Sequence, residues 1–199
     1  METACDVFGE NYQTAQDYVD ILASRGVDWG LIGPREVDRL WPRHVLNSLA
    51  IEPMIGEGRT VVDVGSGAGL PGIPLAIKRP DLSVTLLEPL LRRANFLTEA
   101  VAELGLDERV TVVRVRAEEH RERYDVVTAR AVAALPKLLG WCLPLLAPRA
   151  ELLALKGESA EQELVEAQKQ LRRQRLSGEV IKVPTPGTDE ATWVVRIRS

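Results

Sequence analysis

A glycine-rich turn directly after a short apolar strand constrains this chain more than any other feature. The β-branched segment Thr60–Val64, with Asp63 near its end, runs into Gly65, Gly67 and Gly69. A strand, a glycine turn and a helix in this order open a doubly wound α/β sheet, whose ligands bind at the carboxyl ends of the strands. Glycine lets the backbone adopt positive φ and approach a ligand closely. The segment therefore predicts a ligand site at that edge.

The spacing of the glycines separates two classes of ligand. A dinucleotide fingerprint G-x-G-x-x-G that starts at Gly65 needs glycine at position 70, where this chain has Leu70. The pattern present, G-x-G-x-G, is typical of S-adenosylmethionine-dependent methyltransferases, whose cofactor has no pyrophosphate. A tight strand–helix turn without a ligand is the alternative explanation of the same glycines.

Strands and helices alternate after this turn. The expected strands are Thr60–Val64, Ser83–Leu87, Val110–Val115, Tyr124–Thr128 and Glu151–Leu155, and the expected helices cover about 73–78, 90–104, 133–146 and 160–175. Alternation of this kind implies right-handed crossovers and a parallel sheet that is covered on both faces. Two further strands, 179–183 and 191–197, are separated by too few residues for a crossover helix, so we expect an antiparallel hairpin. The fold class is α/β, with a mostly parallel seven-stranded sheet.

The first part of the chain has helical spacing instead. Apolar residues recur every three or four positions in two sets: Phe8, Tyr12, Ala15 and Val19, and then Val37, Leu40, Trp41, Val45 and Leu49. Each set marks one face of an amphipathic helix. We expect an N-terminal helical cap at 1–59 and a ligand-binding domain at 60–199, which form one globular unit.

Polar residues follow the later strands where they would face the ligand. Glu88 comes about 20 residues beyond the glycine turn, where a carboxylate can accept both ribose hydroxyls. Ala117 and Glu118, after the third strand, are placed to bond the edge of an adenine, and Arg130, after the fourth, to contact cofactor or substrate. The alternatives are an exposed acid that caps the next helix for Glu88, a solvated acidic run for Glu118, and a structural salt bridge for Arg130.

Charge and cysteine content limit the other function classes. The net charge of −4 argues against indiscriminate binding of nucleic acid. Most of the 25 basic residues are arginines in clusters, which leaves local RNA contacts open; the candidates are Arg39, Arg43, Arg92 and Arg93, with a solvated helix face as the alternative. Cys5 and Cys142 are far apart and suggest neither a disulfide nor a metal site, so we expect a cytoplasmic protein. No apolar run is long enough for a bilayer span.

The segment from Val62 to Ala76, VDVGSGAGLPGIPLA, closely resembles the signature of the ribosomal RNA small subunit methyltransferase G family, long called glucose-inhibited division protein B. Four other segments agree with that family: Arg43–Leu49, Arg92–Leu97, Ala129–Ala131 and Ala154–Gly157. The resemblance implies a Rossmann-like class I methyltransferase fold, S-adenosylmethionine as cofactor with S-adenosylhomocysteine as product, and methylation of guanine N7 in the decoding-region loop of 16S rRNA. It implies cofactor contacts at Gly65, Leu70, Ala117, Glu118 and Arg130. Glu88 and Asn47 stand where relatives often have aspartate.

The chemistry of this reaction limits the choice of catalytic residues. Guanine N7 presents an unprotonated lone pair on the major-groove edge, so no general base is required. We expect positioning residues instead, namely His44, Arg130 and Lys156; a helix-surface histidine and a solvated strand-end lysine are the alternatives for His44 and Lys156.

We expect the substrate to be 16S rRNA within the 30S subunit or an assembly intermediate, and the enzyme to act as a monomer without a membrane partner. Two other functions fit the same fold: a small-molecule methyltransferase with the cap as a lid, and a non-catalytic ribosome-assembly module.

Overall fold

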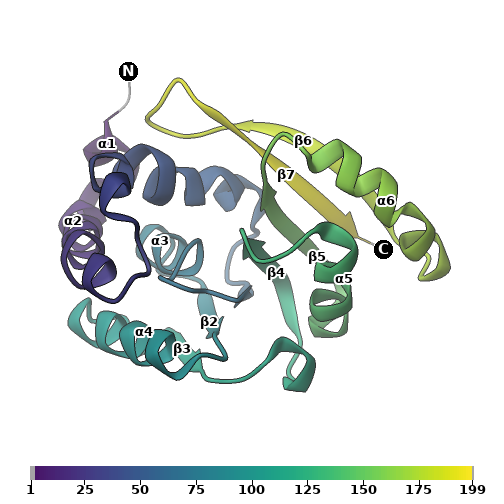
Figure 1. The fold of residues 1–199 in the computed structure, drawn as a ribbon, viewed down its shortest axis with the longest axis horizontal. Coiled ribbons are helices and arrows are strands. Elements are labelled where there is room, and N and C mark those ends of the chain that lie inside the picture. The colour runs from purple at the N-terminus through teal and green to yellow at the C-terminus, as the bar shows by residue number, and fades with distance from the viewer. Residues whose placement is uncertain (1–2, 199) are drawn as a thin grey trace.

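The computed structural model describes residues 3–198, which form a seven-stranded sheet in the order β3-β2-β1-β4-β5-β7-β6 (Figure 1). The strands are β1 Thr60–Val64, β2 Ser83–Leu87, β3 Val110–Val113, β4 Tyr124–Arg130, β5 Leu146–Lys156, β6 Ser177–Pro184 and β7 Ala191–Arg198. The first five pair in parallel, and β7 runs antiparallel to both β5 and β6. The predicted fold class is confirmed, with β7 as the reversed strand.

Helices cover both faces of the sheet. They are α1 Ala4–Phe8, α2 Tyr12–Ile21, α3 Gly72–Lys78, α4 Leu91–Glu103, α5 Leu135–Cys142 and α6 Ala160–Arg173. Successive strand residues point to opposite faces, so Val61 packs in a cluster with the N-terminal helices, α3 and α4, whereas Val62 packs with α5 and α6. Figure 1 shows these two layers on either side of the strands. Within residues 3–198, no helix has both the length and the apolar content that a membrane crossing requires.

The second cap helix differs from the prediction in type. The expected α-helix is a 3₁₀ helix at Pro34–Arg39, a π-helical stretch at Leu40–Leu46 and another 3₁₀ helix at Leu49–Met54. Pro42 and Pro53 lie inside this region and have no N–H to donate, so a regular α-helical ladder cannot continue through them. The apolar spacing nevertheless predicts burial correctly, because the side chains expected on one face lie mostly in the core.

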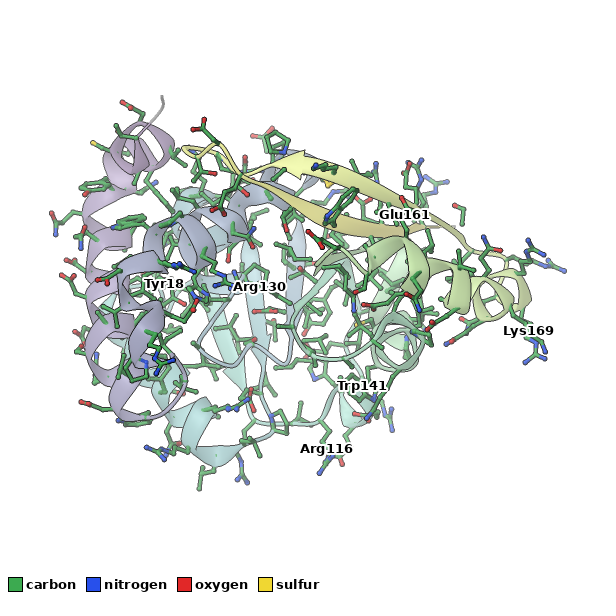
Figure 2. All side chains as sticks on the ribbon, turned by 45° about the horizontal axis from the view of Figure 1, so that its top comes forward. Tyr18, Arg116, Arg130, Trp141, Glu161 and Lys169 are labelled. Atoms are coloured by element: carbon green, nitrogen blue, oxygen red, sulfur yellow. The ribbon has the colours of Figure 1, made fainter. Side chains whose placement is uncertain are left out.

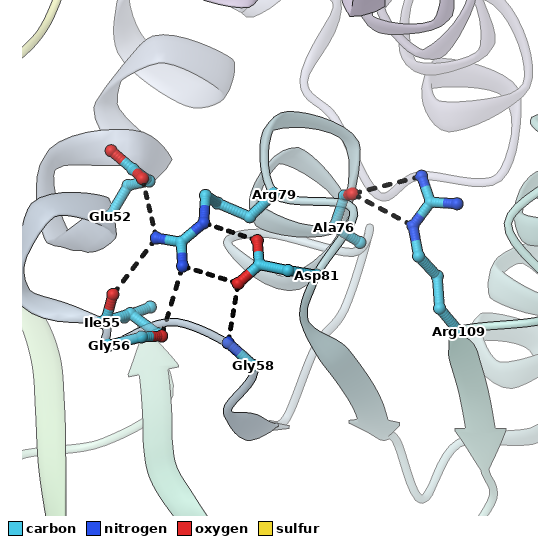
Figure 3. A network of polar contacts seen from close by, with 8 residues as sticks. All are labelled: Glu52, Ile55, Gly56, Gly58, Ala76, Arg79, Asp81 and Arg109. Carbon is cyan, nitrogen blue, oxygen red and sulfur yellow. Dashed lines mark hydrogen bonds and ion pairs between the residues drawn. The ribbon is translucent and has the colours of Figure 1, made fainter.

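A polar network fastens the end of the cap to the sheet (Figure 3). Arg79, just after α3, donates to Glu52 Oε1 at 3.0 Å, to the Ile55 carbonyl at 3.1 Å and to both oxygens of Asp81 at 2.7 and 2.8 Å. Asp81 also accepts the backbone N–H of Gly58 at 2.8 Å. This fork-like pairing holds the connection into β1 at a fixed position.

Candidate functional site

The glycine turn lies where the order of the sheet reverses, because β1 is flanked by β2 and β4. Gly65, Gly67 and Gly69 all have positive φ, at 71°, 58° and 99°. A Cβ on Gly67 would have the Gly65 carbonyl oxygen as its nearest neighbour, 3.9 Å away, whereas a Cβ on Gly69 would lie 2.4 Å from Ile73 Cδ1. Gly67 therefore leaves space in which a ligand can approach the backbone, and Gly69 is required by internal packing.

Two buried carboxylates hold this turn. Asp63 Oδ2 accepts the Gly72 N–H at 3.1 Å, while its buried Oδ1 finds no partner among the described residues, and burial raises the pKa of this carboxyl to about 7. Glu88 is 2% exposed; Oε2 accepts the Gly67 N–H and Oε1 the Leu90 N–H, each at 3.0 Å. The bond to Leu90 reaches the residue before α4, and Glu88 is buried, so it is not the exposed helix-capping acid of the alternative interpretation. A carboxylate has about four lone-pair sites, so Glu88 keeps acceptor capacity for a diol.

Two cavities of about 570 and 140 Å³ lie beside the turn, with Gly65 and Val132 on the walls of both. The smaller one is also lined by Ala117, Glu118 and Trp141. Trp141 lies in α5, is half-buried and lines this cavity. Figure 2 shows Trp141 and Arg116, another lining residue, on the same side of the molecule. A small apolar cavity with an aromatic wall suits a planar base.

A larger cavity of about 900 Å³ lies at the ends of β4 and β5, and its lining includes Arg130 and Lys156. Arg130 Nη2 lies 2.6 Å from Nδ1 of His44, and Nη1 donates to the His44 carbonyl at 3.0 Å. Lys156 donates to Glu163 at 2.7 Å and to the Ala133 carbonyl at 2.6 Å, and its side chain is 10% exposed, so it is not a solvated strand-end lysine. His44 and Arg130 are thus in direct contact, while Lys156 has partners of its own.

The four RNA candidates divide by position, although all are exposed. Arg43 borders the large cavity and also pairs with Glu36 of the cap at 3.4 Å. Arg39 and Arg43 share a smaller hollow next to that cavity. Arg93 lines the 570 Å³ cavity. Arg92 instead donates to the Asp28 carbonyl at 3.2 Å and lies over the Trp29 ring at 5.9 Å, so it is engaged with the cap.

Sequence reasoning missed two residues that shape the site. Tyr18, fully buried on α2, donates its hydroxyl to the Ala68 carbonyl inside the glycine turn. Val132 packs against the position where Gly65 would carry a side chain, at 3.1 Å. Tyr18 lies three residues after Ala15, so helical spacing places it on the buried face, but no local pattern reveals its partner 50 residues away.

Known proteins resemble this chain both in sequence and in fold. A family model described as "GidB: rRNA small subunit methyltransferase G" matches residues 11–190. A protein of Thermobifida fusca named ribosomal RNA small subunit methyltransferase G is 58% identical over 98% of this chain and 84% of its own length. One of the same name from Streptomyces coelicolor is 61% identical over 82% of this chain and 69% of its own.

Solved structures of low sequence identity share the fold. A precorrin-6y C5,15-methyltransferase from Geobacter metallireducens matches with a TM-score of 0.57 and 17% identity, over 85% of this chain and 91% of its own. A 1,6-didemethyltoxoflavin-N1-methyltransferase from Burkholderia thailandensis, solved with S-adenosylhomocysteine, matches with a TM-score of 0.58 and 19% identity, over 92% and 89%.

Proposed function

The chain belongs to the ribosomal RNA small subunit methyltransferase G family, and we propose that it methylates N7 of one guanine in the decoding-region loop of 16S rRNA. It is an S-adenosylmethionine-dependent methyltransferase with a Rossmann-like class I fold. The observation that carries the proposal is the cavity of about 900 Å³ at the ends of β4 and β5, with Arg130 and Lys156 on its wall. It shares Val132 with the two cavities beside the glycine turn. It offers room for a nucleotide beside a cofactor held at the turn.

The residues at the turn fit S-adenosylmethionine. Gly67 leaves open space, Glu88 keeps acceptor capacity for the ribose diol, and the small cavity suits the adenine. We propose the following cofactor contacts: Asp63, Gly65, Gly67, Gly69, Leu70, Glu88, Ala117, Glu118 and Arg130. When bound, the cofactor supplies an electrophilic methyl group on a sulfonium sulfur.

The side chains of the large cavity position the base rather than activate it. Because N7 already carries a free lone pair, no residue has to remove a proton, and none should donate to N7. We propose that Arg130 donates to an oxygen of the nucleotide, either O6 or a phosphate, and leaves N7 free to face the methyl group. Lys156, fixed by Glu163, is proposed to shape the cavity wall. The rate gain then comes from in-line placement and from exclusion of water.

Local arginines support an RNA substrate in spite of the net charge of −4. Arg39 and Arg43 lie beside the large cavity, and Arg93 lines the cavity of about 570 Å³ beside the glycine turn. Phosphates on both sides of the target nucleotide therefore have a partner. We propose that the RNA is presented by the 30S subunit or an assembly intermediate, where its shape adds to these few contacts.

We also propose that the enzyme acts as a monomer. The large apolar side chains that are exposed among the described residues are Leu90, Leu91 and Val165, too few for the apolar core of a stable dimer interface.

Methyl transfer from labelled S-adenosylmethionine tests the proposal. The substrates are 30S subunits and protein-free 16S rRNA from cells that lack this enzyme. The same two substrates from wild-type cells, whose RNA is already methylated, are the control. We expect label in the RNA of the deficient particles, faster with 30S than with free RNA. Absence of label from both RNAs would contradict the RNA substrate, and faster labelling of free RNA would contradict the particle.

A further inference from the structure

Three side chains form a chain of contacts from the surface of the cap to the large cavity. Glu36, in the 3₁₀ helix Pro34–Arg39, has Oε2 3.0 Å from His44 Nε2, and His44 Nδ1 lies 2.6 Å from Arg130 Nη2. The side chains of Glu36 and His44 are 31% and 15% exposed, so the imidazole is the more buried of the two. The contacts join an element of the cap to the end of β4.

The chemistry of the three groups fixes where the protons lie. A guanidinium can only donate hydrogen bonds, so Nδ1 of His44 is unprotonated and accepts a hydrogen bond from Arg130 through its lone pair. The remaining ring proton is then on Nε2, which donates to Glu36. Both contacts exist together only in this neutral tautomer. Burial, then the charge of Arg130 and the weaker effect of Arg43, lower the pKa of His44, and Glu36 opposes them.

Neutral acceptors hold the Arg130 guanidinium in place, and no carboxylate neutralises its positive charge among the described residues. Nη1 donates to the His44 carbonyl at 3.0 Å, to Ser48 Oγ at 3.3 Å and to Asn47 Oδ1 at 3.5 Å, all neutral acceptors. Within the described residues, no carboxylate lies within ion-pair distance of Arg130, and none accepts from its Nε. Nε and the second Nη2 hydrogen therefore remain as donors on a residue that lines the large cavity.

We propose that Glu36 is a positioning residue, which acts through the neutral imidazole of His44 to fix the Arg130 guanidinium for contact with an oxygen of the target nucleotide. The identity of that occupant rests on the proposed function, but the positioning of Arg130 does not. The cap then completes the substrate site rather than only covering the sheet.

Imidazole ¹⁵N spectra test the contacts without any assay of activity. The chain has two histidines, so a His120→Gln variant assigns both signals. We expect His44 at pH 7 to be neutral with Nε2 protonated, and Glu36→Ala to shift the Nε2 signal, because the ring proton loses its carboxylate acceptor. An Nδ1-protonated ring, or a ring unchanged by Glu36→Ala, would overturn the proposal.

Kinetics with 30S substrate test the consequence for the reaction. We expect Glu36→Ala to lower kcat/KM for RNA roughly 10- to 100-fold, because a guanidinium displaced by about 1 Å is poorly placed. The unfolding midpoint should change little, and the loss of S-adenosylhomocysteine affinity should be smaller than the loss of kcat/KM. Asp38→Ala, which removes the same charge two residues away, is the matched control and should behave as wild type. Equal losses in the two variants would overturn the proposal.

A double-mutant cycle separates positioning from a general structural effect. The amide oxygen in His44→Asn can accept from Arg130 as Nδ1 does, but it neither titrates nor reaches Glu36. We expect this variant to retain more activity than His44→Ala. Protonation of His44 removes the Nδ1 acceptor of Arg130, so kcat/KM of the wild type should decline at acid pH, below the lowered pKa of His44, and that of His44→Asn should not. Glu36→Ala should then have a smaller effect than in the wild-type background, because only its ion pair with Arg43, at 3.4 Å, is left to lose; an undiminished effect would overturn the proposal. If the wild-type protein transfers no methyl to RNA, the proposed function fails, and the imidazole spectra still decide the positioning of Arg130.

Discussion

Tyr18 of the N-terminal cap donates its hydroxyl to the carbonyl of Ala68, inside the glycine turn, at 2.8 Å. The tyrosine is completely buried, and the bond joins residues 50 positions apart in the sequence. The same hydroxyl would lie 3.1 Å from a Cβ on Gly69. Figure 2 shows Tyr18 on the cap side of Arg130. The cap therefore supports the cofactor loop directly.

Removal of this hydroxyl should loosen the loop. Tyr18→Phe leaves the Ala68 carbonyl buried without its partner, so we expect a loss of about 1–3 kcal/mol in the free energy of unfolding. Affinity for S-adenosylhomocysteine should fall as well. Urea unfolding and titration calorimetry measure the two effects. Tyr12→Phe, which removes a half-buried hydroxyl bonded to Gln16 at 3.3 Å, is the control; an equal loss there would contradict a specific role for Tyr18.

The open space over Gly67 predicts a variant that folds but does not bind cofactor. Gly67→Arg places a long side chain where the ligand approaches, so binding of S-adenosylhomocysteine should be lost. Gly58→Arg is the matched control, since Gly58 also has positive φ and no atom within 4 Å of a Cβ. Both variants should lose about 1–2 kcal/mol of stability from the backbone strain. Normal binding by a folded Gly67→Arg would show that the ligand does not meet the turn.

The buried Asp63 predicts a dependence of stability on pH. Burial raises its pKa to about 7 in the folded protein, so between its ordinary pKa of 3.8 and 7 the folded state binds more protons than the unfolded state. Stability contributed by this group is therefore present below pH 4 and falls as pH rises to 7. Asp63→Asn removes the dependence, and its stability relative to wild type should rise by up to roughly 4 kcal/mol between pH 4 and 8. Urea unfolding without cofactor at both pH values measures it; a constant difference would contradict the shifted pKa.

The network around Arg79 should stabilise the fold. Arg79→Met leaves the half-buried Glu52 carboxylate and the Ile55 carbonyl of Figure 3 without their charged donor, and we expect a loss of about 2–3 kcal/mol. Arg59, 54% exposed with a single bond to Asp125, provides the comparison. Arg59→Met should change stability by less than about 1 kcal/mol. Similar unfolding midpoints for both variants would mean that the network adds nothing.

The fold was predictable from the sequence because its signals are local. Strand β1 and the turn at Gly65 follow from β-branched residues and glycine spacing, and the short link before β7 implies a hairpin. The helix type at Leu40–Leu46 was not predictable from apolar spacing, since burial of Leu40 and Val45 constrains the face and not the hydrogen-bond register.

The sequence predicted individual residues of the site but not the contacts between them. Strand ends pointed to Glu88 and Arg130, because the carboxyl ends of parallel strands meet at one edge. Tyr18 reaches the Ala68 carbonyl 50 residues away, and Glu36 reaches Arg130 only through His44, so tertiary packing brings these side chains to the site. Their contribution is a matter of long-range geometry that no local pattern encodes.

We propose that this fold delivers a methyl group to N7 of a single guanine. The most direct measurement is methyl transfer to 30S subunits from cells that lack the enzyme, followed by mapping of N7-methylguanine in the 16S rRNA by selective chemical cleavage. We predict one new cleavage, at a guanine in the decoding-region loop, that is absent with Gly67→Arg. Label at another atom, at many guanines, or outside that loop would contradict the account.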